Sequence, residues 1–398
     1  MITERNTGWA TTARDLYLVA MAVFLVTIVI GILNGADAVE FDRNQILTHV
    51  HSGTIGWLTL AIVASAFLVF RTASRPLMIA LAVGVPVYVA AFYTGNLPFR
   101  AISGVVLLAI IGWLIVWAWR TYLASDRTLP QLAVTLGLTA FGYGALFGVL
   151  IQLALATGTT ILPGDTVGAH ASAMTFGYLV LAAMGLIEWR VLDTRGLPMS
   201  GVIQIGSLFI GGLIISVSLL AGTEQIGGML YLLAELIAVV LFVVRVVIPA
   251  ARRTRWLVAD GQRHAAVASL WAVVALLLFM YVVYTFISRP DGALPFPILI
   301  ASDHSVYIGV ITNVVLGLLM ALLLGRASGW LPHLVFWGVN LGLAIFVVGL
   351  ITEAAEIKRI GAPLMGVALL IALGWLATRA IGSGVATDDS MGSAPASS

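Results

Sequence analysis

The feature that most constrains this chain is a succession of about twelve apolar stretches, each near the length that crosses a lipid bilayer. A membrane-spanning helix needs about 20 predominantly apolar residues, and short segments rich in Arg, Gly and Pro separate these stretches. Hydrophobic residues make up 61% of the 398 and charged residues only 10%, so the chain lacks the polar surface of a water-soluble globule. The sequence therefore predicts an all-α, polytopic membrane protein.

The predicted spans form one transmembrane domain over residues 1–382. No small-residue cleavage site follows the first span, so we expect it to be retained and not removed as a signal peptide. The residues after the transmembrane domain, 383–398, are predicted to form a disordered cytoplasmic tail. The twelve spans cover residues 15–33, 49–70, 76–94, 101–122, 130–157, 166–191, 198–221, 226–248, 264–287, 302–324, 332–351 and 362–381.

The positions of the basic residues predict the orientation. With the N-terminus in the cytoplasm, fifteen of the 20 lysines and arginines fall on the cytoplasmic side and the other five fall outside. Cytoplasmic loops carry an excess of basic residues in plasma-membrane proteins. We therefore expect an inner (plasma) membrane protein with both termini cytoplasmic, and no nucleic-acid partner. The five outer residues are Arg43, Arg100, Arg289, Lys358 and Arg359.

The absence of cysteine limits the chemistry. It excludes disulfides, thiolate metal sites, iron-sulfur clusters and covalently attached c-type haem. Any metal or cofactor ligand must come from His, Met, Asp, Glu or Tyr.

A short motif, [His/Ser]-x-[His/Ser]-x4-Gly, recurs at the predicted outer ends of the second, sixth and tenth spans. It reads HVHSGTIG at 49–56, HASAMTFG at 170–177 and SDHSVYIG at 302–309. The recurrence every four spans predicts three repeated four-helix units, at about 15–122, 130–248 and 264–381. The glycines of the motif favour either close helix packing or the approach of a flat ligand to the backbone.

The spacing within the motif predicts how the histidines pair. Residues two apart on a helix point about 200° apart, so His49 and His51 should face different neighbours. If the three units surround a pseudo-threefold axis, His49 meets His304 and His51 meets His170. Two imidazoles on facing helices in an apolar wall can hold a haem iron from both sides. The third gap then receives two serines, Ser172 and Ser302.

The segment HVHSGTIGW at 49–57 resembles HVHSGALGW of the C-family haem-copper oxidases, where the two histidines ligate two different haems. Twelve helices with ligands near the outer ends of spans two, six and ten are also similar to the haem-copper oxidase catalytic subunit and to the NnrS family, which responds to nitric oxide. This resemblance implies a redox protein that binds haem b, about two per chain. The metal ligands that it implies are His49, His51, His170 and His304.

The chain departs from the oxidase pattern in its copper ligands. Those oxidases carry the His-x-His on span ten and take two copper ligands from span seven, whereas span seven here has no histidine. A three-histidine copper site is therefore not expected, and two histidines on each iron favour electron transfer. If one member of the His51–His170 pair held copper or moved away, nitric oxide or oxygen chemistry and an oxidoreductase activity would follow. Candidate partners for the haem propionates are the outer cations Arg43, Arg100, Lys358 and Arg359.

Other polar residues favour structural roles. His264 follows an arginine-rich loop and is expected at the surface, and His333 repeats the His-x4-Gly spacing at the opposite membrane face. Glu235 in span eight could relay protons or bond a neighbouring helix. Asp303 could orient an imidazole or cap its helix.

Two other function classes stay open. A secondary transporter commonly has twelve helices, but such folds usually repeat every five or six helices around a site at the midplane. A cofactor-free accessory membrane subunit is the third possibility. The sequence identifies neither an electron donor nor an acceptor.

Overall fold

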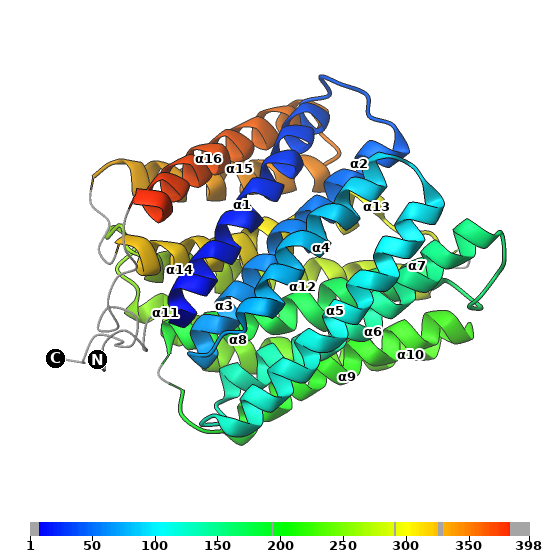
Figure 1. The fold of residues 1–398 in the computed structure, drawn as a ribbon, viewed down its shortest axis with the longest axis horizontal. Coiled ribbons are helices and arrows are strands. Elements are labelled where there is room, and N and C mark those ends of the chain that lie inside the picture. The colour runs from blue at the N-terminus through cyan, green and yellow to red at the C-terminus, as the bar shows by residue number, and fades with distance from the viewer. Residues whose placement is uncertain (1–7, 193, 290–291, 325–328, 383–398) are drawn as a thin grey trace.

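Twelve helices in the described part of the chain are long and apolar enough to cross a bilayer, which confirms the predicted number (Figure 1). The structure is a computed structural model that describes residues 8–192, 194–289, 292–324 and 329–382. These residues are helical apart from the connecting segments and form no strand. Helices satisfy their own backbone hydrogen bonds, as a chain in lipid requires. The predicted tail at 383–398 lies outside the described residues.

Eight of the spans are single α-helices, and four contain a π-helical segment between two α-helical ones. The single helices are α1 (Gly8–Gly35), α4 (Arg75–Tyr93), α5 (Leu97–Ala124), α6 (Leu129–Thr157), α9 (Met199–Ala221), α12 (Gly261–Ser288), α15 (Leu331–Ile351) and α16 (Ala355–Gly382). The composite spans are α2 (Arg43–His51), η1 (Ser52–Thr59) and α3 (Leu60–Phe70); α7 (Thr166–Ser172), η2 (Ala173–Leu179) and α8 (Val180–Val191); α10 (Glu224–Phe242), η3 (Val243–Val247) and α11 (Ile248–Arg253); and α13 (Phe296–His304), η4 (Ser305–Thr312) and α14 (Asn313–Leu324).

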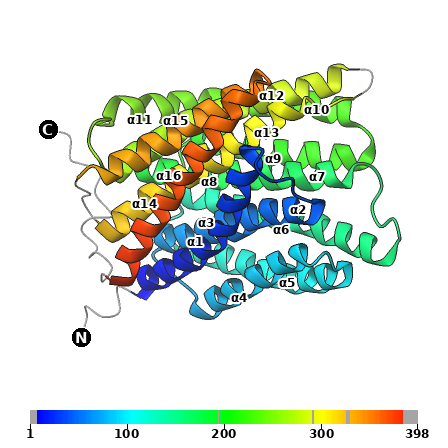
Figure 2. The same cartoon turned by 90° about the horizontal axis from the view of Figure 1, so that it is seen from above.

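The three spans that carry the histidine motif form the centre of the bundle. Between 83% and 94% of the apolar window of each is buried, against 39–56% in the other nine. Helices α3, α8 and α14 contact one another, and the remaining helices pack around them (Figure 2). The three spans also share one α–π–α pattern, with the π segment after the motif histidine. Three repeated four-helix units remain a prediction.

Threonine hydroxyls donate to backbone carbonyls within the π segments. A π turn shifts backbone bonding from i→i−4 to i→i−5 and leaves some carbonyls short of a donor. Thr59 donates to the carbonyl of Thr54 at 2.9 Å, and Thr312 donates to that of Tyr307 at 2.7 Å, each five residues earlier. Trp57 on η1 donates to the Thr312 hydroxyl at 2.8 Å and so ties span two to span ten.

Two central spans begin earlier than predicted. Helix α2 begins at Arg43 and not at residue 49, because Asp42 and Gln45 form a capping box with two 2.9 Å hydrogen bonds. Helix α13 begins at Phe296 and not at residue 302, next to a proline that favours the first helical turn. The motif histidines therefore lie inside their helices, at or near the α–π junction, and do not begin them.

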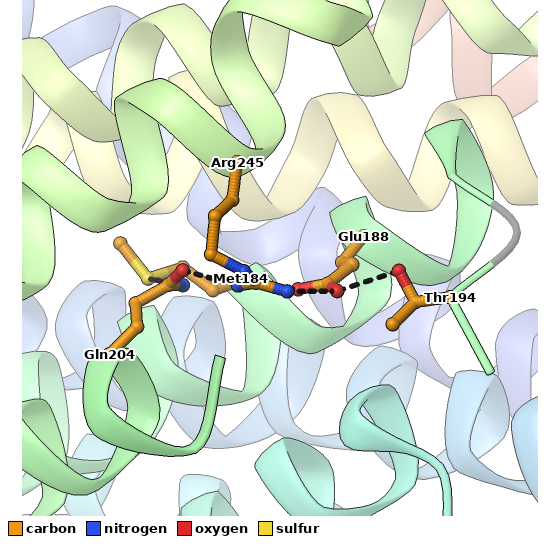
Figure 3. Close-up of polar contacts among 5 residues, drawn as sticks. All are labelled: Met184, Glu188, Thr194, Gln204 and Arg245. Atoms are coloured by element: carbon orange, nitrogen blue, oxygen red, sulfur yellow. Dashed lines mark hydrogen bonds and ion pairs between the residues drawn. The ribbon is translucent and has the colours of Figure 1, made fainter. Parts of the chain in front are cut away.

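A buried ion pair lies at the end of the bundle opposite the histidines (Figure 3). Arg245 of η3 donates from Nη2 to Glu188 Oε1 of α8 at 2.7 Å, with the side chains 13% and 3% exposed. Gln204 of α9 accepts from Arg245 Nη1 at 2.6 Å, and the Thr194 hydroxyl donates to Glu188 Oε1 at 2.7 Å. The cluster therefore links α8, α9 and η3, and the guanidinium at its centre comes from η3.

Candidate functional site

The four predicted ligands lie at one end of the bundle, which we call the histidine end. His49 and His51 are on α2, His170 is on α7 and His304 is on α13. All four side chains are partly buried. The motif glycines beside them pack directly against neighbouring helices. For example, a Cβ on Gly309 would lie 2.6 Å from the Trp271 side chain. Close packing is thus the role that the structure gives these glycines.

Each of the four imidazoles uses Nδ1 in the same way. A backbone carbonyl can only accept a hydrogen bond, so its Nδ1 partner must carry the hydrogen and Nε2 keeps its lone pair. No described group is hydrogen-bonded to any of the four Nε2 atoms. A metal-binding imidazole typically has this arrangement, with the other ring nitrogen anchored by a carbonyl. The Nδ1 contacts are His49 to Thr27 O at 2.9 Å, His51 to Leu47 O at 2.7 Å, His170 to Gly144 O at 2.8 Å and His304 to Ile300 O at 2.9 Å.

His51 and His170 line a common cavity of about 380 Å³. This volume falls within the range of small-molecule and cofactor sites, about 300–1,000 Å³. The two imidazoles are near enough to interact electrostatically. The walls come from α4, α5 and α6 and are mostly apolar and aromatic, including Tyr88, Phe92, Leu107, Ile111 and Phe141.

Close backbone approach and an aromatic stack hold these two rings in place. The His51 ring stacks on Phe92 with centroids 3.7 Å apart and planes 16° from parallel. A Cβ on Gly148 would lie 2.8 Å from His170 Cε1, so only glycine leaves room for this ring. The sequence motif did not indicate Phe92 or Gly148, because α4 and α6 carry no copy of the motif.

His49 and His304 form the second pair. They are near enough to interact electrostatically, and they lie between spans two and ten beside α1 and α15. A Cβ on Gly31 of α1 would lie 3.0 Å from His49 Cε1. The His304 ring packs against Phe346 of α15 with centroids 4.9 Å apart. Both proximities match the pairing derived from the motif.

Arg100 and Arg43 line the cavity of the first pair. Arg100 is 4% exposed, although it was predicted as an outward cation. Its guanidinium donates to three neutral oxygens, namely Asn44 Oδ1 at 2.7 Å, the Phe92 carbonyl at 2.8 Å and the Ala91 carbonyl at 3.3 Å. Among the described residues no carboxylate pairs with Arg100. A buried cation without an anion is suited to a carboxylate from a ligand.

Lys358 and Arg359 have a protein partner. Lys358 Nζ lies 2.8 Å from Asp37 Oδ1, and Arg359 Nε lies 2.9 Å from Asp37 Oδ2. Asp37 follows α1, so the two pairs link the α1–α2 connection to α16 at the histidine end. These hydrogen bonds hold the pKa of the Asp37 carboxyl below its ordinary value. Any propionate would share the two cations with Asp37.

The lowered pKa of Asp37 has a direct consequence for stability. The folded state favours the carboxylate, so the ion pairs stabilise the protein at neutral pH and stop doing so as the pH falls through the lowered pKa. Asp37→Asn should therefore lower the unfolding temperature slightly at pH 7, because the pairs are exposed, and the two curves should converge in acid. Thermal unfolding across acidic pH measures this, with Glu40→Gln in the same connection as the control. A difference that stays constant with pH would contradict the assignment.

The third gap between the central spans is filled by aromatic side chains. Phe176 of η2 stacks on Phe279 of α12 with centroids 3.4 Å apart, and Tyr231 of α10 meets Phe279 edge-on. Ser302 donates to the Ala275 carbonyl at 2.9 Å. Glu235 lies one turn after Tyr231 and interacts with it, but neither of its buried carboxyl oxygens has a hydrogen bond of good geometry among the described residues.

The prediction for His264 was wrong. The side chain is fully buried and its Nδ1 lies 3.0 Å from Asn313 Oδ1. Helix α12 begins at Gly261, one turn before His264, where Asp260 caps it and Gly261 packs directly against the Gly317 backbone. This close approach draws the first turn of α12 into the bundle.

His333 lies at the end opposite the histidine end, as predicted. Its Nδ1 is 3.0 Å from Nη1 of Arg263, a structural contact. Within the described residues, no group of three or more His, Asp or Glu side chains is arranged to hold a metal ion. A haem iron held by two imidazoles needs only two histidines.

Comparison with models of known protein families and with curated proteins found no match.

Proposed function

We propose that this protein is an integral membrane redox protein that holds two b-type haems near one membrane face, each between two histidines. The first pair is His51 with His170, and the second is His49 with His304. The observation that carries this proposal is the shared bonding of the four imidazoles. Each anchors Nδ1 on a backbone carbonyl and leaves Nε2 to a ligand.

The surroundings of the first pair suit a macrocycle with acidic groups at its edge. The walls from α4, α5 and α6 are mostly apolar, and Arg43 and Arg100 supply positive charge. Arg100 donates to neutral oxygens only and can also donate to a propionate. When bound, haem supplies one-electron chemistry at iron. The chain itself orients the four imidazoles that would hold the haems, through the backbone carbonyls and, for His51, through its stack on Phe92.

The position of both sites on α2 favours electron transfer. His49 and His51 are two residues apart, so their side chains leave opposite faces of one helix. Electrons would then have only the thickness of α2 to cross between the sites. Two imidazoles on each iron leave no vacancy for a gas, so we favour an electron carrier over a reductase. The resemblance of 49–57 to the C-family haem-copper oxidases supports this class of function.

The orientation is part of the same proposal. The excess of arginine at the end opposite the histidines supports cytoplasmic termini in a plasma membrane, with both haem sites near the outer face. The same bundle end holds the start of α1 and the end of α16 (Figure 1).

The test is the colour of the purified protein. Full-length chain made in haem-supplied cells should give a pyridine-haemochrome spectrum of b-type haem at about two equivalents per chain. Low-spin paramagnetic-resonance signals should accompany it, since each iron has two imidazole ligands. A folded but colourless preparation would overturn the proposal and would favour the transporter or accessory-subunit classes.

A further inference from the structure

A polar cavity of about 570 Å³ opens at the end of the bundle opposite the histidine end. It lies among the ends of α3 and α8, the start of α6, and the α5–α6 and α8–α9 connections. Three arginines line it, Arg71, Arg190 and Arg195, and Asp126 is the only lining acid among the described residues. The described lining residues therefore carry net positive charge, and the proposed haem sites make no use of this cavity.

Arg190 is the unusual member of this cavity. It is partly buried, and its guanidinium makes no hydrogen bond or ion pair with any described residue. Its Nε is buried without a partner. Buried donors in proteins are nearly always satisfied, so an orphaned one calls for a ligand or an ordered water. A guanidinium needs such a partner more than other donors do, because it presents five N–H donors and cannot lose its charge.

Asp260 interacts with Arg190 but does not bond to it. Asp260 is near enough to interact with it electrostatically. However, Asp260 Oδ1 accepts from the backbone N–H groups of Gln262 and Arg263, at 3.1 and 3.2 Å, and caps α12. No ion pair joins Asp260 to Arg190 among the described residues.

The other lining groups favour a phosphate-bearing ligand. Arg71 follows α3 with its backbone in the left-handed region, at φ 49°, and ends that helix at the cavity. Guanidinium groups bind phosphate oxygens with paired hydrogen bonds. Trp189 also lines the cavity, and Trp is enriched at the depth of lipid headgroups. Basic pockets between membrane helices bind acidic headgroups.

We infer that this cavity binds a phosphate group, from an anionic phospholipid headgroup or from a soluble phosphate compound. Arg190 and Arg71 provide the charged hydrogen bonds. The inference is independent of haem, because no residue is shared with the histidine cavity.

The experiment uses the full-length protein in two arms. In the first, inorganic phosphate is titrated into protein in a neutral detergent, and the unfolding temperature is followed. In the second, the unfolding temperature is compared in nanodiscs of phosphatidylcholine and of phosphatidylcholine mixed with phosphatidylglycerol. A rise in the first arm identifies a soluble phosphate ligand, and a rise in the second arm alone identifies a headgroup.

The variants are Arg190→Gln and Arg71→Gln, with Arg252→Gln as the matched control. Arg252 is exposed on α11 at the same end of the bundle and does not line the cavity. Loss of one charged hydrogen-bond partner should weaken the apparent affinity about tenfold or more. Arg71 is exposed, so Arg71→Gln decides the matter if Arg190→Gln fails to fold. No rise in either arm, or a rise that both variants keep as fully as the control does, would overturn the inference.

Discussion

Substitution of His51 by alanine is expected to remove about one of the two proposed haems and to leave the other in place. The His51–His170 cavity would lose an axial imidazole, whereas His49 and its carbonyl anchor on Thr27 lie on the other face of α2. His170→Ala should remove the same haem and leave the same residual spectrum. Pyridine-haemochrome content and low-temperature optical spectra of the purified variants measure this.

The second pair provides the reciprocal result. His49→Ala and His304→Ala should share a residual spectrum, and that spectrum should differ from the one that His51→Ala and His170→Ala share. His333→Gln is the matched control, because His333 lies at the opposite end and glutamine keeps an acceptor for Arg263. If His51→Ala and His170→Ala removed different haems, or if each histidine variant kept both, the pairing would be wrong.

Replacement of Arg245 by methionine should lower stability by about 3–5 kcal/mol, because it leaves a buried carboxylate without its cation. Glu188 is 3% exposed in its side chain, and among the described residues it would keep only the neutral Thr194 hydroxyl as a hydrogen-bond donor to its side chain (Figure 3). Gln204 would also lose its 2.6 Å contact with Arg245. Chemical unfolding in detergent micelles, followed by tryptophan fluorescence, measures the change.

A double variant separates the buried charge from the lost packing. Glu188→Gln combined with Arg245→Met should recover much of the stability, because neither position then carries a charge that has lost its partner. Arg14→Gln is the control, since the Arg14–Asp15 pair is partly exposed and should be worth at most about 1 kcal/mol. Equal losses from Arg245→Met and from the control would show that the buried pair contributes little.

The number and the approximate course of the helices follow from local composition. Apolar stretches of spanning length have no alternative in lipid but to form helices, and the structure has twelve. Helix starts were less predictable. The capping box at Asp42 extends α2 by a turn and a half beyond the apolar stretch that begins at His49, because a helix can continue through polar residues once its first N–H groups are satisfied.

The candidate site was predictable only in part. The recurring motif indicated four histidines and an arrangement that places His51 beside His170, and the structure has both in one cavity. The motif carried no information on Phe92 or Gly148, because these come from neighbouring helices that bear no repeated pattern. Arg100 was predicted on the outer side, but its burial was not predictable, since its donors meet backbone carbonyls at the end of α4.

The sequence by itself determined that this chain is a bundle of membrane-spanning helices, because hydropathy and helix length depend only on residues adjacent in the chain. It also determined which imidazoles share a bundle end, because the motif lies at the same end of every fourth span. Only the tertiary structure decided that Nδ1 of His49 and of His170 meets a carbonyl of another helix, that His264 is buried and that Arg190 Nε lacks a partner among the described residues. These properties depend on the atoms of other helices, and helix packing in a membrane is set by local shape and interhelical hydrogen bonds that no single stretch of sequence specifies.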